Sequence, residues 1–294
     1  MKKTLSLILA LFMLLSATVL FASCTNNAGK TSKGVKVINY ALSEESYAFA
    51  VNKQDTELLA KVNEYLAIIV ADGTFDAICD RYFGSGTPVK VQSAKRDESK
   101  DQLVVATSTG FEPFEMVENG EFFGIDMEIA AGLAAFLGKE LVIEDMQFAS
   151  VVTSVQNGLC DIGMAGLTIT PAREEIVVFS NSYYNASQVL IVRDNDTTFD
   201  NCKSADDVVA ILEGFNKSKK IGCQAGTTGE IYIVGDLDLG DDGYGFKGLP
   251  VTKMAYDYGA LAFTAMLNGE IDYVILDNAP AAAIAKAINA KNSK

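Results

Sequence analysis

The stretch Gly166–Glu175, with the sequence GLTITPAREE, has residue types and a spacing that suit a helix start able to hold an anion. Thr170 is a good helix cap, and Pro171 suits the first helical position, where a missing N–H group costs nothing. Arg173 then falls in the first turn, at the positive end of the helix dipole, where acidic residues are usually preferred. An arginine at this position needs a negative partner.

Two kinds of partner are compatible with this stretch. Glu174 or Glu175 would leave Arg173 as an ordinary solvated side chain, and local chemistry by itself favours that interpretation. The other is a bound carboxylate or phosphate, held by the guanidinium group, the free helix N–H groups and the hydroxyl of Thr168.

The composition limits what else the chain can be. Its 294 residues, 49% hydrophobic and 21% charged, predict a globular protein of two domains or lobes. Residues 1–23 have the pattern of a secretory signal, with an apolar run from Leu5 to Phe21. Removing Lys2 and Lys3 from the 24 basic residues leaves 22 against 38 acidic ones, a formal charge near −16. Nucleic acid and anionic membrane surfaces are therefore not expected as partners.

Cys24 directly follows the predicted signal. The sequence Phe21-Ala22-Ser23-Cys24 resembles a bacterial lipobox, in which the cysteine is acylated, and residues 24–34 form a polar tether. The alternative is a plain cleaved signal followed by an unmodified cysteine. No other apolar run is long enough to span a bilayer, so we expect an exported protein held at the outer face of the cell membrane by its lipid.

The other four cysteines do not have metal-ligand spacing, and the chain has no histidine, so we expect neither a metal site nor a cofactor. An exported protein can form disulfides, and buried free thiols are equally compatible with the sequence. These cysteines are Cys79, Cys160, Cys202 and Cys223.

Apolar runs at Val35–Tyr40 and Tyr47–Val51 predict two strands, after which a helix capped by Asp55 extends to Gly73. The apolar face of that helix consists of Leu58, Leu59, Val62, Leu66 and Ile69. A shorter helix is expected at Phe75–Phe83. The polar, aperiodic stretch Gly84–Gln102 is typical of a linker.

From Leu103 the pattern becomes strand, loop, helix, strand: Leu103–Thr107, a helix capped by Asp126 and ending at Gly138, then Leu141–Glu144. This alternation predicts parallel sheets, whose ligands collect at the carboxyl ends of the strands. The loop at one such end carries Ser108 and Phe111. Phe111 is either a stacking platform for a ligand or an aromatic residue of the core or a lid.

A short internal repeat indicates two similar α/β lobes. An apolar helix, the motif Asn157-Gly158-Leu-Cys-Asp161 and a strand are matched later by a helix, Asn268-Gly269-Glu-Ile-Asp272 and a strand. Between them, the strand Ile221–Gln224 leads into the loop Ala225–Gly229, whose amides and hydroxyls suit an oxyanion.

The strand Tyr273–Leu276 delivers Asp277 at its carboxyl end. Arg173 and the threonines would then hold an anion, and Asp277 a cation. A small ligand carrying both charges a short distance apart is an amino acid.

Several ordered motifs resemble the type II periplasmic amino-acid-binding proteins of ABC transporters. They are PFE at Pro113–Glu115, GIDMEIA at Gly124–Ala130, TITPAR at Thr168–Arg173, FSNSYY at Phe179–Tyr184, QAGTTGE at Gln224–Glu230 and LNGEIDYVILDN at Leu267–Asn278. The resemblance implies a two-lobe α/β periplasmic-binding-protein-like II fold, and it favours a bound anion as the partner of Arg173.

The resemblance also implies roles for individual residues. The ligand's α-carboxylate would be held by Arg173, Thr168 and Thr228, beside Thr227, and its ammonium by Asp277 and the Gly166 carbonyl. Phe111 would pack on the aliphatic part of the ligand. Ser108, Phe148 and Gln224 fall where the family varies its side-chain pocket. Members that bind cationic amino acids often have an acid at the position of Ser108, so a neutral polar ligand is expected.

The function implied is capture of a free amino acid between two lobes, by a monomer that delivers it to an ABC transporter permease. One alternative is an enzyme, because some proteins of this fold are cyclohexadienyl dehydratases. Without histidine, such an enzyme would need Glu112, Glu115 or a lysine as its acid or base. A second alternative is an extracellular sensor domain. A sensor would need a transmembrane or cytoplasmic segment after Lys294 to carry its signal, and we do not expect one.

The order of the motifs differs from that of the family. The segment that usually follows the aspartate equivalent to Asp277 resembles residues 36–55, KVINYALSEESYAFAVNKQD, and then ADGTFDAICDRYFG at Ala71–Gly84. We therefore expect a circular permutation, in which Gly84–Gln102 joins the usual C-terminus to the usual N-terminus; the alternative is an unrelated N-terminal extension. One lobe would comprise residues 47–185, and the other residues 35–46 and 186–294.

Overall fold

The computed structural model describes residues 33–237 and 243–292. The predicted signal at 1–23, the predicted lipidation at Cys24 and most of the tether lie outside the described residues. Within the described ranges, no helix has the length and apolar character needed to cross a membrane.

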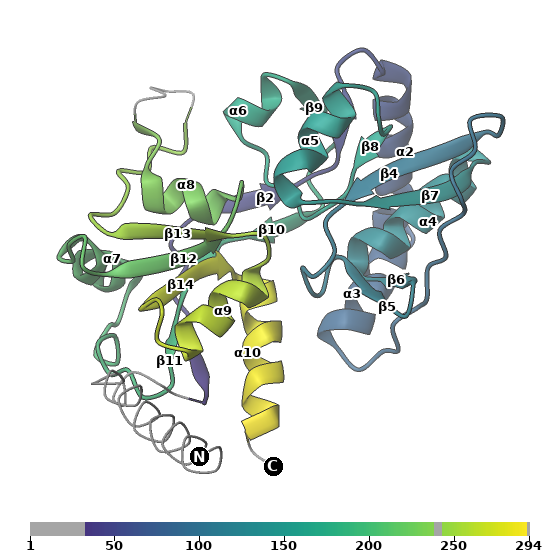
Figure 1. The fold of residues 1–294 in the computed structure, drawn as a ribbon. Helices are drawn as coiled ribbons and strands as arrows, with labels where there is room; N and C mark the ends of the chain where they lie inside the picture. The colour runs from purple at the N-terminus through teal and green to yellow at the C-terminus, as the bar shows by residue number, and fades with distance from the viewer. Residues whose placement is uncertain (1–32, 238–242, 293–294) are drawn as a thin grey trace, which may run out of the picture. The chain divides into compact units, whose positions relative to one another are not determined.

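Two five-stranded mixed sheets form the framework (Figure 1). We call the part built on the first sheet lobe I. Its strand order is β7 (Glu140–Asp145), β4 (Gln102–Thr107), β8 (Ile162–Gly163), β3 (Ala50–Asn52) and β9 (Val177–Phe179). Its other elements are α2 (Thr56–Ala71), α3 (Thr74–Phe83), α4 (Ile125–Leu137), α5 (Phe148–Gln156), α6 (Pro171–Glu174) and the hairpin of β5 (Met116–Glu118) and β6 (Glu121–Phe123).

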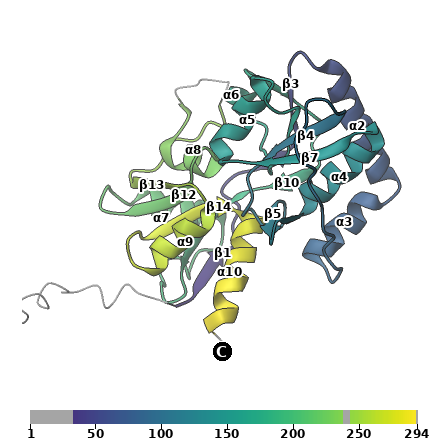
Figure 2. The ribbon, with the colours of Figure 1, turned by 45° about the vertical axis from the view of Figure 1, so that its right-hand side comes forward.

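Lobe II is built on the second sheet. Its strand order is β1 (Val35–Ile38), β11 (Gln188–Arg193), β14 (Tyr273–Asp277), β12 (Lys220–Gln224) and β13 (Thr252–Tyr256). Its helices are α7 (Ala205–Glu213), α8 (Thr228–Val234), α9 (Gly259–Leu267) and α10 (Asn278–Asn292). Helix α10 packs along β1 (Figure 2) and also contacts β11.

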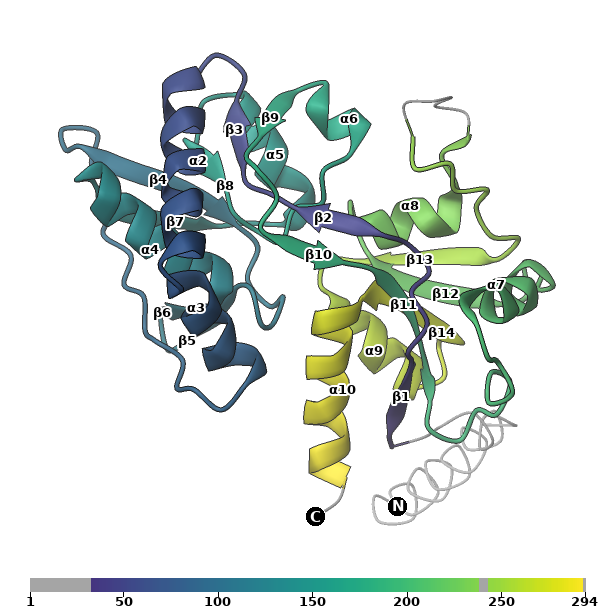
Figure 3. The ribbon, with the colours of Figure 1, turned by 180° about the vertical axis from the view of Figure 1, so that it is seen from behind.

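An antiparallel ribbon of β2 (Glu45–Tyr47) and β10 (Tyr184–Ala186) runs between the lobes (Figure 3). The segment before residue 84 therefore contributes to every part of this framework. It supplies β1 to the lobe II sheet, β2 to the ribbon and β3 to the lobe I sheet. As predicted, β1 lies in the same sheet as β12 and β14, and the segment is not a free-standing subdomain.

Helix α2 forms where its sequence predicts. The carboxylate of Asp55 accepts a hydrogen bond from the N–H of Leu58 at 2.9 Å and so caps the first turn. The apolar positions Leu58, Val62, Leu66 and Ile69 are buried, while Leu59 is partly buried. Gly73, with φ +82°, has the left-handed conformation that ends a helix at low cost.

Three sequence predictions were wrong. Tyr47–Val51 is not one strand, because the chain leaves the ribbon after Tyr47 and joins the lobe I sheet at Ala50. The sheets are mixed rather than parallel, because β3 and β11 arrive from the ribbon and run antiparallel to their neighbours. Asp126 does not cap α4. Gly124 occupies the cap position, and the buried carboxylate of Asp126 accepts instead from the Gly166 N–H and the Tyr183 hydroxyl.

The repeated Asn-Gly-x-x-Asp motif has one structural role in both lobes. Asp161 accepts a hydrogen bond from the N–H of Val104 at 2.7 Å and donates its own N–H to the Val104 carbonyl at 2.8 Å. Asp272 makes the same pair of bonds with Lys220, both at 2.9 Å. Each aspartate therefore holds the start of the strand that follows it, β8 or β14, against the neighbouring strand of its sheet. The two lobes are alike in this respect, as the repeated motif predicts.

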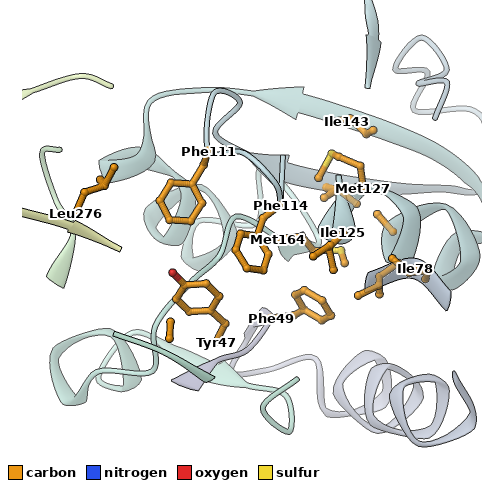
Figure 4. Close-up of a cluster of buried hydrophobic side chains, with 14 of the residues drawn as sticks. Tyr47, Phe49, Ile78, Phe111, Phe114, Ile125, Met127, Ile143, Met164 and Leu276 are labelled. Carbon is orange, nitrogen blue, oxygen red and sulfur yellow. The ribbon is translucent and has the colours of Figure 1, made fainter. Parts of the chain in front are cut away.

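The aromatic residues near the ribbon belong to the core. The ring of Tyr47 meets that of Phe114 edge-on, with centroids 5.2 Å apart, and lies 5.7 Å from that of Tyr184. Figure 4 shows Tyr47, Phe111 and Phe114 gathered beside Phe49 and the apolar side chains of lobe I. Tyr47 and Phe114 have no exposed surface, so the ribbon is anchored by apolar packing as well as by backbone hydrogen bonds.

The paired aspartates give a first prediction. Asp161→Ala and Asp272→Ala should each lower the free energy of unfolding by roughly 1–3 kcal/mol, because each leaves a strand N–H without its charged acceptor. Chemical denaturation of purified protein measures this. Glu270→Ala, at an exposed position beside the second motif, serves as the control. Losses no larger than that of the control would contradict the shared role.

Candidate ligand site

The predicted site residues follow strand ends from both lobes. In lobe I, Ser108 comes directly after β4, and Gly166 and Thr168 come after β8. In lobe II, Thr227 and Thr228 follow β12 and Asp277 is the last residue of β14. The carboxyl ends of parallel strands are where α/β sheets bind ligands.

Helix α6 begins as its sequence predicts. The Thr170 hydroxyl accepts from the Arg173 N–H at 3.2 Å, and Pro171 occupies the first helical position. Among the described residues, the hydrogen-bond partners of the Arg173 guanidinium group are carbonyl groups and not carboxylates. It donates to the carbonyl of Thr168 at 2.6 Å and to that of Gly226 at 3.0 Å. Because Gly226 lies in lobe II, Arg173 joins the two lobes.

A buried carboxylate lies between the two threonines that were predicted to hold the ligand's carboxylate. It belongs to Glu45 of β2, and its Oε2 accepts from the hydroxyl of Thr168 at 2.8 Å and from that of Thr228 at 2.6 Å. Its Oε1 accepts from the Ser43 hydroxyl at 2.6 Å. The structure thus brings Thr168 and Thr228 together around a carboxylate.

Asp277 belongs to the same network. The side-chain amide of Gln188 donates to Oδ2 of Asp277 at 2.5 Å and to the Thr228 hydroxyl at 3.1 Å. Asp277 is 3% exposed. The predicted anion and cation positions are therefore adjacent, because Thr228 and Gln188 connect them.

Gly166 and Phe111 pack against each other. Gly166 has φ +53°, and a Cβ atom there would lie 2.7 Å from Cε1 of the Phe111 ring, so only glycine fits. The ring of Phe111 is also 6.4 Å from that of Tyr47 and is 6% exposed. Phe111 is therefore a buried aromatic residue at the site's edge.

The structure places the remaining predicted residues as follows. Phe148 begins α5, with its ring centre 5.2 Å from Cζ of Arg173, a cation–π distance. The Thr227 hydroxyl donates to the carbonyl of Gln224 at 2.8 Å, a bond within the loop. Ser108 is 1% exposed, and its hydroxyl has no hydrogen-bond partner among the described residues.

Electrostatics at the site reflect burial. Burial raises the pKa of Asp277 well above its usual value, and the nearby carboxylate of Glu45 raises it further. Burial lowers the pKa of the Arg173 guanidinium group, an effect opposed mainly by Glu45. Burial disfavours the charged forms of Asp277 and Arg173, so a bound partner of opposite charge would stabilise each of them.

Sequence reasoning missed three members of this network, Ser43, Glu45 and Gln188. Glu45 lies on β2, a strand of three residues, and Gln188 lies at the start of β11; neither strand was predicted from the sequence. Their partners are remote in sequence: Thr168 is 123 and Thr228 is 183 residues from Glu45. No local spacing indicated these contacts.

All four cysteines within the described residues are free thiols, which decides between the two possibilities that the sequence left open. Within the same ranges, no group of three or more acidic or cysteine side chains is arranged to hold a metal ion.

Comparison with known proteins identifies the family. Residues 103–289 match the model of the bacterial extracellular solute-binding proteins, family 3. The chain belongs to this family. A solved structure of arginine-bound ArgBP from T. maritima, a single-residue variant, is 34% identical to this chain, with a TM-score of 0.51, and covers 67% of this chain and 80% of its own. The fold is thus the two-lobe, type II periplasmic-binding-protein fold.

Two further relatives of this family 3 chain are informative. The arginine-binding extracellular protein ArtP of Bacillus subtilis (strain 168) is 32% identical over 134 residues, which are 46% of this chain and 48% of ArtP. The ancestral amino acid-binding protein AncCDT-1, a precursor of cyclohexadienyl dehydratase, is 29% identical, with a TM-score of 0.52, over 64% of this chain and 74% of its own.

The chain spans about half to two thirds of the length of the curated relatives it matches. The matched family is one of solute-binding proteins, and ArtP and AncCDT-1 are both described as binding proteins. They confirm the prediction of a binding protein rather than an enzyme.

Buried acids in this family 3 chain give a prediction about pH. Burial raises the pKa of Asp126 from its usual 3.8 to about 7, and burial also raises that of Glu115 and Asp277. The folded protein then keeps protons that the unfolded chain has released, so all three groups lower stability as pH rises, and for Asp126 the fall lies between about pH 4 and about pH 7. Asp126 alone would cost up to about 1.4 kcal/mol per pH unit in that window.

Thermal unfolding midpoints measured from pH 4 to pH 8 check this. The midpoint of Asp126→Asn should decline less steeply with pH than that of the parent, because the amide does not titrate. Asp206→Asn, at an exposed position, should follow the parent. Parallel profiles for Asp126→Asn and the parent would show that Asp126 is not the titrating group.

Proposed function

We propose that this protein captures a free amino acid between its lobes and delivers it to an ABC importer. The observation that carries the proposal is the carboxylate held jointly by Thr168 of lobe I and Thr228 of lobe II. A position that holds one carboxylate with two hydroxyls has the donors that an amino acid's carboxylate needs.

The charges around this position support a zwitterionic ligand. Arg173 lies beside Thr168 and provides a guanidinium fork, while Asp277 provides a buried carboxylate on the other side of Thr228. The ligand's carboxylate would bind Arg173, Thr168 and Thr228, and its ammonium would bind Asp277 and the Gly166 carbonyl. Closure of the lobes around it would exclude water and strengthen both interactions.

Ser108, Phe148 and Gln224 would line the side-chain compartment. The unpartnered, buried hydroxyl of Ser108 favours a ligand that can hydrogen-bond to it, because buried polar groups are rarely left unsatisfied. Ser108 is neutral, so we propose a neutral polar amino acid. Arginine is the second candidate, because ArtP and ArgBP are described as arginine-binding or arginine-bound.

We also propose that the chain is circularly permuted relative to its family. The family match starts at residue 103, although the residues before it supply β1, β2, β3, α2 and α3 to the same framework. A permuted chain explains why a colinear comparison covers only part of such a fold. The proposed lobe boundaries are 47–185 for lobe I, with 84–102 as the joining segment, and 35–46 plus 186–294 for lobe II.

The ends of the described chain support this proposal. The side chain of Asn289 in α10 accepts from the Val35 N–H at 3.0 Å and donates to the Val35 carbonyl at 2.8 Å. Asn292 donates to the carbonyl of Lys33. The end of α10 and the start of β1 are therefore adjacent, as they must be if the usual chain is continuous there.

Acylation of Cys24 would complete this arrangement. The tether at 24–34 leads directly into β1, so a lipid on Cys24 would anchor the protein through lobe II. The polar tether and the strongly acidic composition favour a protein held at the membrane by its lipid alone.

The function is tested by thermal shift with a panel of the common amino acids. Ligand at about a hundred times its dissociation constant should stabilise the fold by roughly 2.7 kcal/mol. Arg173→Ala should weaken binding more than about a hundredfold, since two charge-assisted hydrogen bonds of roughly 1.5–3 kcal/mol each are lost.

Arg96→Ala, which removes an exposed arginine, is the matched control and should bind like the parent. Absence of any shift across the panel, with parent protein that unfolds cooperatively, would overturn the proposed function. Equal affinity of Arg173→Ala and the parent would overturn the role of Arg173 alone.

The permutation is tested by restoring the usual order. A chain that starts at Lys95, runs to Asn292 and continues through a short glycine-serine linker into residues 33–94 should fold, because the joined ends are adjacent. Its thermal midpoint should lie within a few degrees of the parent's, since only connectivity changes. A reordered chain that is soluble but unfolded by circular dichroism would count against the proposal.

A further inference from the structure

Glu45 occupies the position at which the proposed function places the ligand's carboxylate. Its side chain is 5% exposed and receives hydrogen bonds from Ser43, Thr168 and Thr228 at 2.6, 2.8 and 2.6 Å. Thr168 and Thr228 come from different lobes. A ligand carboxylate that uses the same two hydroxyls cannot occupy that position while Glu45 does.

Gln188 binds Asp277 where the proposed function places the ligand's ammonium. Its amide donates to Oδ2 of Asp277, as a ligand's ammonium would, while its backbone N–H donates to the Ser43 hydroxyl at 2.8 Å. Ser43 in turn donates to Glu45. A carboxylate from β2 and an N–H donor from β11, linked through Ser43, therefore imitate the two ends of an amino acid.

We infer that Glu45 is an internal occupant of the carboxylate position and sets the affinity of the site, because an incoming amino acid must displace it. This inference rests on the proposed function. Glu45 belongs to the ribbon between the lobes, so the same carboxylate holds the lobes together when no amino acid is bound. The amino acid takes over both hydroxyls and that bridging role.

Displacement has a thermodynamic consequence. If the site is open to a ligand for only a fraction of the time, the apparent affinity is reduced by that fraction. Glu45→Gln retains an oxygen that can accept from the threonine hydroxyls but removes the negative charge that competes with the ligand's carboxylate. The ligand then competes with a neutral amide, which is the weaker hydrogen-bond acceptor.

The experiment compares amino-acid binding by the parent, Glu45→Gln and Glu44→Gln, using calorimetric titration with L-glutamine and L-arginine. Glu44 is exposed and next to Glu45, so its variant makes the same charge change outside the network. We expect Glu45→Gln to bind at least about tenfold more tightly, about 1.4 kcal/mol, and Glu44→Gln to match the parent.

A second measurement does not depend on the identity of the ligand. Glu45→Ala removes the internal carboxylate, and sodium acetate should then raise its thermal midpoint above that in sodium chloride of equal ionic strength. The parent should show no such difference, because its own carboxylate fills the position. A merely structural role of Glu45 would produce destabilisation without this response to acetate.

The outcomes separate the inference from the proposed function. Tighter binding by Glu45→Gln, or binding by that variant alone, supports both. Acetate stabilisation of Glu45→Ala without amino-acid binding by any variant supports internal occupancy and overturns the proposed function. Unchanged or weaker binding by Glu45→Gln overturns the inference and leaves the function intact; selective loss of arginine binding would instead show Glu45 contacting a cationic ligand side chain.

Discussion

A carboxylate shared by hydroxyls from two lobes is the interaction on which this structure depends. Glu45 is buried, and burying a charge is costly unless hydrogen bonds compensate for lost water. The donors come from Thr168 and Thr228, which lie at strand ends in different sheets. The cost of burying one charge therefore couples the positions of both lobes, and separating them would remove at least one donor.

The ribbon between the lobes places this charge. Strands β2 and β10 pair with each other and not with either five-stranded sheet, and the rings of Tyr47 and Tyr184 pack against the core at their lobe I end. Glu45 faces the network only two residues from Tyr47. The packing of Tyr47 thus holds the strand that carries Glu45, and the hydroxyls of Ser43, Thr168 and Thr228 hold its carboxylate.

Features governed by neighbours in the sequence were predictable. The Asp55 cap of α2, the Thr170–Pro171 start of α6 and the paired aspartates at 161 and 272 all depend on contacts within a few residues or on a repeated pattern. Family resemblance then placed Arg173, Thr168, Thr228 and Asp277 at one site, where the structure brings them together.

Features governed by distant partners were not predictable. Asp126 has the local pattern of a helix cap, yet the N–H of Gly166, 40 residues away, and the hydroxyl of Tyr183, 57 residues away, bind its carboxylate. Glu45 and Gln188 were not predicted at all, because nothing in the sequence of a short strand reveals which hydroxyls surround it. Tertiary hydrogen bonds override local preference most strongly for buried polar groups, since leaving one unsatisfied costs more than losing a cap.

The change in chain order bears directly on Glu45. β1 is the first strand of this chain, and only residues 39–44 separate it from Glu45 at the charged end of the ribbon. Asn289 of α10 holds β1 at its start. Arg193, in the same sheet as β1, donates to the Met266 and Ile271 carbonyls. Contacts within lobe II therefore hold both β1 and the sheet that it joins. If Cys24 is lipidated as proposed, the tether would therefore lead into a strand that a helix and a sheet secure before the chain reaches Glu45.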